Sequence, residues 1–452
     1  MLAFPCRPAL RRFRRVLLRL DPPWRHLIVA ALAGGLGALA VLAFKRTLFF
    51  LEFVFVGAHE GHLVAAARAL NDTARLSAPC LGALAAGMLL WLAKRGQQAV
   101  PQRKSLARRS GDYIEAVAVG NGRLDLHEGL LKVTASLLVV STGGSIGREG
   151  AMILLAAMLA SMLGRVLGRG VDLRLIVSCG AAAGMATAYH APLAGAVFVA
   201  EILLGSLSLS QFGPVVVATV TAYGVSISLG ERSVLFPVAG VTVTGVAQVG
   251  ALLLLGVIGG VLGAGLLRWL RLARSLFERT RLPPPLAFAL GGLIVGVLSL
   301  WRPEVWGNGY SSIRAQLDDP AVWSLVALVL GFKLLAIAAT TGSGAPGGVF
   351  TPTLFVGAAT GVLAAAGVGS LIGNVVFQPV YAVVGMAVLL AATTHAPVMS
   401  ALMVFEMTGQ YALLPVLLAA SVVSTLLSRR LEPVSVYGLV RPRERERSRA
   451  PE

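Results

Sequence analysis

The chain has 452 residues, of which 56% are hydrophobic and only 13% are charged, and its mean hydropathy is +0.79. Soluble globular domains carry about 25% charged residues, so this composition excludes an ordinary soluble enzyme or binding domain. The formal net charge of +18 does not indicate a nucleic-acid partner, because no hydrophilic domain is present to carry a basic binding surface.

Long apolar stretches follow one another along the chain and predict membrane-spanning helices. They lie at 27–44, 79–93, 131–163, 174–204, 213–229, 247–269, 286–301, 322–340, 350–373, 379–407 and 411–428. Several are much longer or shorter than the ~20 residues of one upright span, and glycine and proline interrupt many of them. We therefore expect an all-α integral membrane protein with tilted helices that break within the bilayer.

Both ends of the chain are rich in arginine. Such arginines beside the first and last spans are typical of cytoplasmic segments and of contact with anionic membrane lipid. We expect a basic cytoplasmic segment at 1–25, a transmembrane domain at 26–430 and a short basic cytoplasmic tail at 431–452. The tail is too short for a regulatory or catalytic domain. With both termini in the cytoplasm, the number of membrane crossings is expected to be even.

An internal repeat divides the transmembrane part. "HAPLAGAVFVAE" (190–201) reappears as "HAPVMSALMVFE" (395–406), and "GREGA" (147–151) matches the position of "GVFTP" (348–352). The repeats cover about 27–230 and 245–430. Two equal halves with an odd number of crossings each have opposite orientations in the membrane. Inverted-topology repeats with broken helices meeting at mid-membrane are the architecture of transporters.

Three glycine-containing segments interrupt apolar sequence: "RRSGDYIEA" (108–116), "TGGSIGREGAM" (142–152) and "TGSGAPGGVFTP" (341–352). A helix that starts at mid-depth exposes free N–H groups and the positive end of its dipole, and glycines let a ligand approach the backbone. These features favour a bound anion. The alternative is that the segments are only kinks or turns between spans.

Glu149 is a carboxylate at expected bilayer depth, which marks an ion or proton pathway. Beside helix N-termini it can itself occupy an anion site, so we predict a protonatable gate that blocks when charged and opens when protonated or displaced. A salt bridge with Arg148 is the structural alternative, although adjacent helical residues do not face each other. An intramembrane enzyme with Glu149 or Glu201 as general base lacks a nucleophile, metal cluster or cofactor motif. We expect no enzyme activity, no metal and no cofactor.

"GREG", "GSGAPGGVFTP", the paired His-Ala-Pro segments and a terminal tyrosine together resemble the CLC family of chloride channels and chloride/proton antiporters. The resemblance covers nearly the whole chain, and "SGDYIEAV", "VWGNGYSSI" and "THAPVMSALM" are most similar to bacterial members described as voltage-gated. It implies the CLC fold without CBS domains, with chloride and similar small anions as the transported ligands. It also implies a homodimer with one pore per subunit, in contact with lipid in a bacterial inner membrane.

The resemblance also implies roles for single residues. Glu149 matches the family's gating glutamate, although Ala151 replaces the usual proline of that motif. The match at Ser110 is looser, because Asp112 and Tyr113 replace an Ile-Pro pair. The anion-binding residues implied by the resemblance are Ser110, Gly147, Arg148, Gly150, Val349, Phe350 and Tyr437.

One departure from the family pattern concerns protons. In antiporters that resemble this chain, two consecutive glutamates follow the "APLAG" segment, and the second transfers protons on the inner side. Here Glu201 occupies the first position and Ile202 the second. An isoleucine cannot relay a proton, which favours passive, channel-like chloride conduction. Chloride/proton exchange stays open as the alternative, through Glu201 or a chain of water.

Overall fold

The computed structural model describes residues 12, 15–17, 19–59, 62–98, 112–118, 120–168, 170–204, 209–231, 234–238, 245–318, 322–372 and 378–438. The described part of the chain is helical, and a single isolated bridge is its only extended pairing. Nine of the described helices are long and apolar enough to cross a membrane. The predicted all-α membrane architecture is confirmed, whereas most of 1–25 and 439–452 lie outside the described residues.

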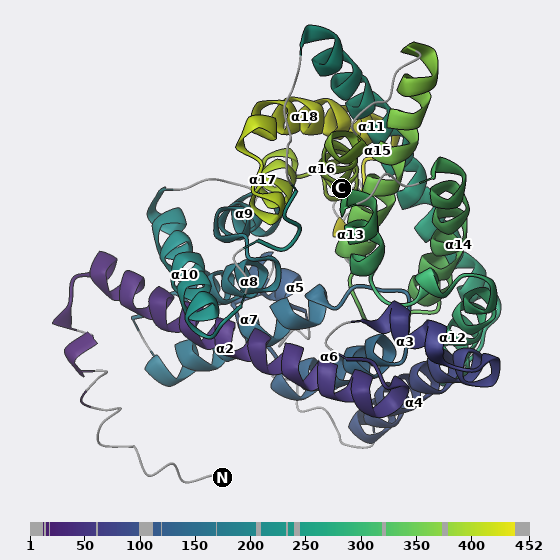
Figure 1. Cartoon of the computed structure of the whole chain (residues 1–452). Coiled ribbons are helices and arrows are strands. Elements are labelled where there is room, and N and C mark those ends of the chain that lie inside the picture. The colour runs from purple at the N-terminus through teal and green to yellow at the C-terminus, as the bar shows by residue number, and fades with distance from the viewer. Residues whose placement is uncertain are drawn as a thin grey trace, which may run out of the picture.

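The helices of the first half run in chain order through Figure 1. They are α2 (Pro22–Val56), α3 (Leu63–Ala69), α4 (Asp72–Gln98), α5 (Tyr113–Ala118), α6 (Leu126–Ser141), α7 (Glu149–Leu167), α8 (Leu173–Tyr189), α9 (Pro192–Phe198), the π-helical turn η1 (Val199–Leu204) and α10 (Leu209–Ser228).

The second half repeats this order. It consists of α11 (Val246–Arg279), α12 (Pro284–Trp301), the 3₁₀ turn η2 (Pro303–Val305), α13 (Tyr310–Asp318), α14 (Trp323–Gly342), α15 (Phe350–Ile372), α16 (Gln378–Thr394), α17 (Pro397–Thr408), the 3₁₀ turn η3 (Tyr411–Leu413) and α18 (Leu414–Leu431).

The long apolar stretches are broken as predicted. The stretch 131–163 contains α6 and α7, which are separated at 142–148. The stretches 174–204 and 379–407 break at His190 and His395, both of which have left-handed backbones (φ 56° and 61°). Each histidine ends a helix of 17 residues, α8 or α16, and is followed by Ala-Pro, which starts the next helix. The two His-Ala-Pro segments are therefore equivalent helix breaks.

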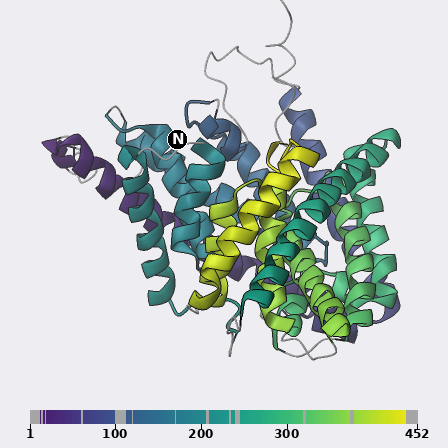
Figure 2. The same cartoon turned by 90° about the horizontal axis from the view of Figure 1, so that it is seen from above.

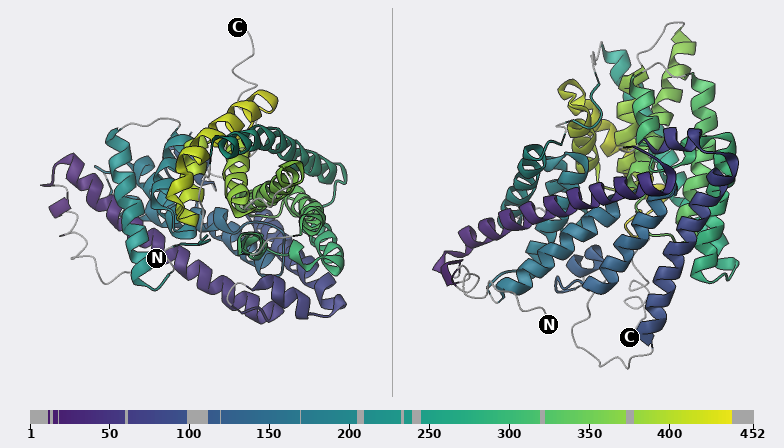
Figure 3. Two further views of the ribbon diagram at one scale, coloured as in Figure 1. Left: turned by 45° about the horizontal axis from the view of Figure 1, so that its top comes forward. Right: turned by 60° about the horizontal axis from the view of Figure 1, so that its bottom comes forward.

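The two halves pack closely through small residues. α4 of the first half packs along α12 of the second half, where a Cβ on Gly292 would lie 2.2 Å from the carbonyl oxygen of Pro79. Glycine at this position lets the two backbones approach, as in other membrane helix pairs. Within the halves, α2 runs obliquely across α7, α8 and α10 (Figure 3), and α18 lies against α11 (Figure 2). The breaks after α6 and α14 are thereby enclosed inside the protein.

A pair of carboxylates joins the halves symmetrically. Glu201 in η1 accepts the backbone N–H groups of Val398 and Met399, at 3.3 and 2.9 Å, at the start of α17. Its repeat partner Glu406, in α17, accepts the N–H groups of Leu193 and Ala194, at 3.0 and 2.8 Å, at the start of α9. Each carboxylate therefore supplies hydrogen bonds that the first turn of the partner helix lacks.

We expect Glu201→Gln and Glu406→Gln to lower the free energy of unfolding by similar amounts, about 1–2 kcal/mol each, because an amide offers one acceptor oxygen and no charge. Thermal unfolding of the purified protein in detergent measures this, with each variant serving as the other's control. If only one of the two variants were destabilised, the equivalence of the two caps would be wrong.

Candidate functional site

The centre of the site is a contact between the two broken-helix loops. Gly147, two residues before α7, and Gly348, two residues before α15, form an antiparallel bridge. The N–H of Gly147 donates to the carbonyl of Gly348 at 2.6 Å, and the N–H of Gly348 donates to the carbonyl of Gly147 at 2.8 Å. A Cβ on Gly147 would lie 2.8 Å from the Gly348 oxygen, so glycine is required there. The bridge brings the N-termini of α7 and α15 together.

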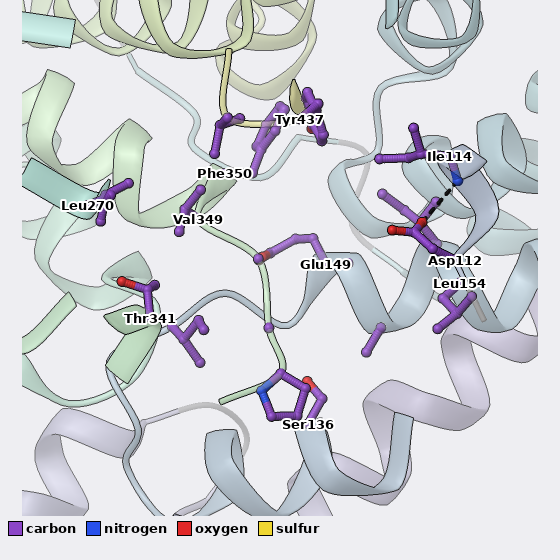
Figure 4. Close-up of a pocket in the computed structure, with 18 of the residues that line it drawn as sticks. Asp112, Ile114, Ser136, Glu149, Leu154, Leu270, Thr341, Val349, Phe350 and Tyr437 are labelled. Carbon is purple, nitrogen blue, oxygen red and sulfur yellow. Dashed lines mark hydrogen bonds between the residues drawn. The ribbon is translucent and has the colours of Figure 1, made fainter. Parts of the chain in front are cut away.

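A cavity of about 730 Å³ reaches this contact. Glu149, the first residue of α7, lies at its wall and is 1% exposed. In Figure 4, Glu149 points towards the segment that carries Val349, with Phe350 and Tyr437 on one side and Ser136 on the other. The predicted site residues that line the cavity are Glu149, Gly150, Val349, Phe350 and Tyr437.

The carboxylate of Glu149 is held on one oxygen. The Oγ1 of Thr351 donates to Glu149 Oε1 at 2.5 Å, and the Nδ2 of Asn308 donates to the same oxygen at 3.2 Å. Glu149 Oε2 has no hydrogen-bond partner among the described residues. The hydroxyl of Tyr189 in turn lies 3.1 Å from Thr351 Oγ1. The gating position predicted from the sequence therefore belongs to a polar cluster that draws on both halves.

The side chain of Arg148 turns away from Glu149. No ion pair between these two residues occurs in the described part of the chain. The guanidinium lies over the rings of Phe49 and Tyr310, 5.6 and 5.4 Å from their centroids. It also lines a second, smaller pocket of about 40 Å³ together with Glu52 and Asn308. The salt-bridge alternative for "RE" therefore finds no support.

Tyr437 reaches the cavity from the C-terminal segment. The preceding residue, Val436, donates its N–H to the carbonyl of Thr393 at 2.9 Å. The ring of Tyr437 meets that of Phe198 edge-on, with centroids 6.0 Å apart. Glu432, five residues earlier, forms ion pairs with Arg268 and Arg271 of α11. These contacts fix the short segment that carries the tyrosine.

The cavity also has charged walls. Lys132, Arg271 and Arg274 line it, together with the carboxylates of Asp112 and Glu278. Lys132 pairs with Glu128 at 2.9 Å, and Arg274 pairs with Glu278 at 3.2 Å. A cavity with more cationic than anionic side chains raises the local concentration of anions.

Not all predicted residues can be placed. Ser110 lies outside the described residues. Gly147 and Arg148 adjoin the cavity through the glycine bridge and the smaller pocket. Sequence reasoning assigned no role to Thr351, Asn308 or Tyr189. The first two lie inside the motifs "GVFTP" and "VWGNGYSSI", and the third directly precedes a His-Ala-Pro segment.

Lys333 supports the segment that presents Asn308. Its side chain in α14 is fully buried. Its Nζ lies 2.7–3.3 Å from four backbone carbonyl oxygens, those of residues 304–307. An ammonium group has three N–H donors, so all of them have acceptors here. Lys333 therefore holds the chain directly before Asn308.

A second buried lysine adjoins Tyr189. Lys45 in α2 donates to Glu231 at 2.7 Å and to the carbonyl of Thr187 at 3.3 Å. His190 lies 3.3 Å from the same oxygen of Glu231. Glu231 follows α10, and its hydrogen bonds with His190 and Lys45 lower its pKa from 4.5 to about 2. The cluster ties the end of α8, and with it Tyr189, to α2.

Comparison with known proteins agrees with this geometry. Residues 86–429 match the family described as voltage gated chloride channel. The chain is 48% identical over 417 residues to the voltage-gated ClC-type chloride channel ClcB of Salmonella dublin, covering 92% of this chain and 98% of that protein. It is 44% identical over 416 residues to ClcB of Escherichia coli O6:H1, with the same two coverages.

Solved structures share the fold. A slow cyanobacterial Cl⁻/H⁺ antiporter aligns with a TM-score of 0.78 at 23% identity, over 93% of this chain and 97% of that one. A CLC-type fluoride/proton antiporter aligns with a TM-score of 0.72 at 24% identity, over 92% and 97%. With these matches, the resemblance first noted in the motifs is confirmed: the chain is a multi-pass membrane protein that belongs to the CLC voltage-gated chloride channel family, a family of channels and transporters rather than of enzymes.

Proposed function

We propose that this protein conducts chloride and similar small anions across a bacterial inner membrane through a pore gated by Glu149. The observation that carries the proposal is the convergence of the N-termini of α7 and α15 on one cavity wall, joined by the Gly147–Gly348 bridge. Free N–H groups and helix dipoles attract an anion without a full positive charge that would trap it. A carboxylate at the same place competes with that anion.

In this proposal the anion follows the backbone of the two helix starts. Gly147, Arg148 and Gly150 offer amides at the outer site, and Val349 and Phe350 offer amides at the central site. Tyr437 and Ser110 supply hydroxyl groups at the central site. The side chain of Arg148 adds positive charge beside the smaller pocket.

We propose channel-like conduction rather than coupled exchange. Ile202 packs against the apolar core and has no proton to transfer. Glu201, the other candidate for the inner proton position, already accepts two backbone N–H groups of α17. A carboxylate engaged in a helix cap is a poor proton carrier, because protonation weakens both hydrogen bonds.

Chloride/proton exchange on the same scaffold is the second candidate. It is favoured by the solved structures of similar fold, which are described as antiporters. The curated relatives with 44–48% identity are described as chloride channels. Ile202 and the capping role of Glu201 separate the two candidates.

The deciding experiment measures reversal potentials of purified protein in planar bilayers under separate chloride and proton gradients. We expect a reversal potential that follows the chloride gradient alone, by about 59 mV per tenfold ratio. The Glu201→Gln variant is expected to have the same reversal potential, as befits a structural carboxylate. A shift with the proton gradient at constant chloride would establish exchange, and loss of that shift in Glu201→Gln would identify the proton carrier.

We further propose a homodimer with one pore per subunit and both termini in the cytoplasm. Membership of the family supports the dimer. The arginine-rich ends of the sequence support the orientation.

A further inference from the structure

Two hydroxyl groups extend from the gating carboxylate into the protein. Thr351, the second residue of α15, donates to Glu149 Oε1 at 2.5 Å. Tyr189, the last residue of α8, lies within hydrogen-bond distance of Thr351, at 3.1 Å. Both side chains are completely buried. The three residues thus form one continuous chain, Tyr189–Thr351–Glu149, across the two halves of the protein.

The chemistry of the groups gives this chain a direction. A charged carboxylate only accepts hydrogen bonds, so the single hydroxyl proton of Thr351 is directed at Glu149. Thr351 then accepts the proton of the Tyr189 hydroxyl. Both hydroxyl dipoles point their positive ends at the carboxylate. Hydrogen bonds to a charged acceptor are about twice as strong as neutral ones, so the chain is strongest when Glu149 is charged.

The partners are also held in place. The Tyr189 ring packs against the ring of Phe350, with centroids 4.9 Å apart. His190, the next residue, is fixed by Glu231 and Lys45. Because neither hydroxyl has to be ordered when the carboxylate arrives, the position for a charged Glu149 is preformed.

We infer that Thr351 and Tyr189 are positioning residues that hold the charged Glu149 carboxylate in its blocking position and thereby set the pH at which the pore opens. This inference rests on the proposed gate. It adds that the opening pH is written in two hydroxyl groups rather than in Glu149 alone.

Other charged and titratable groups surround Glu149 and stay constant in the variants below. They are Arg148 at the start of α7, Lys45 and Glu52 on α2, Tyr310 on α13, Tyr437 in the C-terminal segment, and Lys132 and Asp112 along the cavity. None of them is within the hydroxyl chain, so removal of one hydroxyl changes only the chain itself.

The test measures chloride flux from proteoliposomes as a function of pH. Thr351→Val removes the hydroxyl and keeps the volume, so the pH of half-maximal flux is expected to rise by about one unit, a tenfold change in proton concentration. Tyr189→Phe acts one hydroxyl further away and is expected to shift the midpoint by about 0.5 unit in the same direction. Thr351→Ser keeps the hydroxyl and is expected to restore the midpoint of the unmodified protein.

Repeating the substitutions in a Glu149→Gln background separates the chain from the gate. There, Thr351→Val and Tyr189→Phe are expected to leave flux independent of pH. If Glu149→Gln alone kept a pH-dependent flux, the proposed gate would be wrong. If Glu149→Gln behaved as proposed while Thr351→Val and Tyr189→Phe kept the original midpoint, only the hydroxyl chain would be refuted. Gel filtration checks folding, and Tyr189→Phe decides the question if Thr351→Val does not fold.

Discussion

Glu149→Gln is expected to give a protein whose chloride flux no longer depends on pH and is at least about tenfold higher at neutral pH than that of the unmodified protein. Glutamine has the size of glutamate and still offers an oxygen to Thr351 and Asn308. It lacks the charge with which the carboxylate competes against chloride. Hydrogen bonds to a charged group are worth about 1.5–3 kcal/mol, and 1.4 kcal/mol corresponds to a factor of ten in occupancy of the blocking position.

The measurement is flux from proteoliposomes between about pH 4.5 and 8, a range that spans the titration of an ordinary glutamate and a perturbed one. Glu128→Gln is a matched control. Glu128 is a half-exposed carboxylate on α6, paired with Lys132 and outside the walls of the cavity. Its variant should keep the original pH profile. A Glu149→Gln protein that folds but carries no flux would mean that the carboxylate is required for conduction rather than for closing the pore.

The sequence was sufficient to predict the broken helices, because the physics that breaks them is local. Glycines at 143, 144 and 147 and the His-Ala-Pro segments mark helix ends whatever surrounds them. The repeat offset also contained the main feature of the site. Gly147 and Gly348 occupy equivalent positions in the two halves, and they are the residues that bridge.

The contacts of the gate could not be predicted in the same way. Thr351 is 202 residues from Glu149, and Tyr189 is 162 residues from Thr351. Threonine and tyrosine in apolar helices are usually satisfied by their own backbone or at the membrane interface, so neither signals a buried partner by its type. Only packing of α8 against the start of α15 brings the two hydroxyls together.

Glu201 shows how a correct residue can receive an incomplete reading. In the sequence it stands where a proton carrier is expected in related antiporters, next to Ile202. In the structure it caps α17, and the equivalent Glu406 caps α9. The repeat predicts this symmetry, but the fact that each glutamate reaches the other half's helix depends on how the halves dock.

Lys333 gave a clearer signal, since a single lysine inside "LVALVLGFKLLAIAATT" is expensive in a membrane and therefore functional by default. What the sequence hides is its partner. The acceptors are four backbone carbonyls of residues 304–307, in the segment between α12 and α13. Together they neutralise much of the cost of burying the ammonium group.

Lys333→Met is accordingly expected to lower the free energy of unfolding by about 3 kcal/mol or more, because the carbonyls stay buried and lose their donors. Asn308 follows these residues directly and donates to Glu149. A loosened segment is therefore also expected to raise the pH of half-maximal flux, in the same direction as Thr351→Val. Thermal unfolding in detergent and the pH profile of flux measure the two effects separately.

Leu335→Met is the matched control for this prediction, since Leu335 lies two residues further along α14 and is 47% exposed on the outer face. It introduces the same side chain into the same helix without touching the 304–307 segment. We expect it to change neither stability nor the pH profile. A Lys333→Met protein with unchanged unfolding and gating would mean that the carbonyls find other donors, and that the lysine is not what connects α14 to the gate. A protein that is destabilised but keeps its pH midpoint would confine Lys333 to folding and leave Thr351 as the principal hydrogen-bond donor to Glu149.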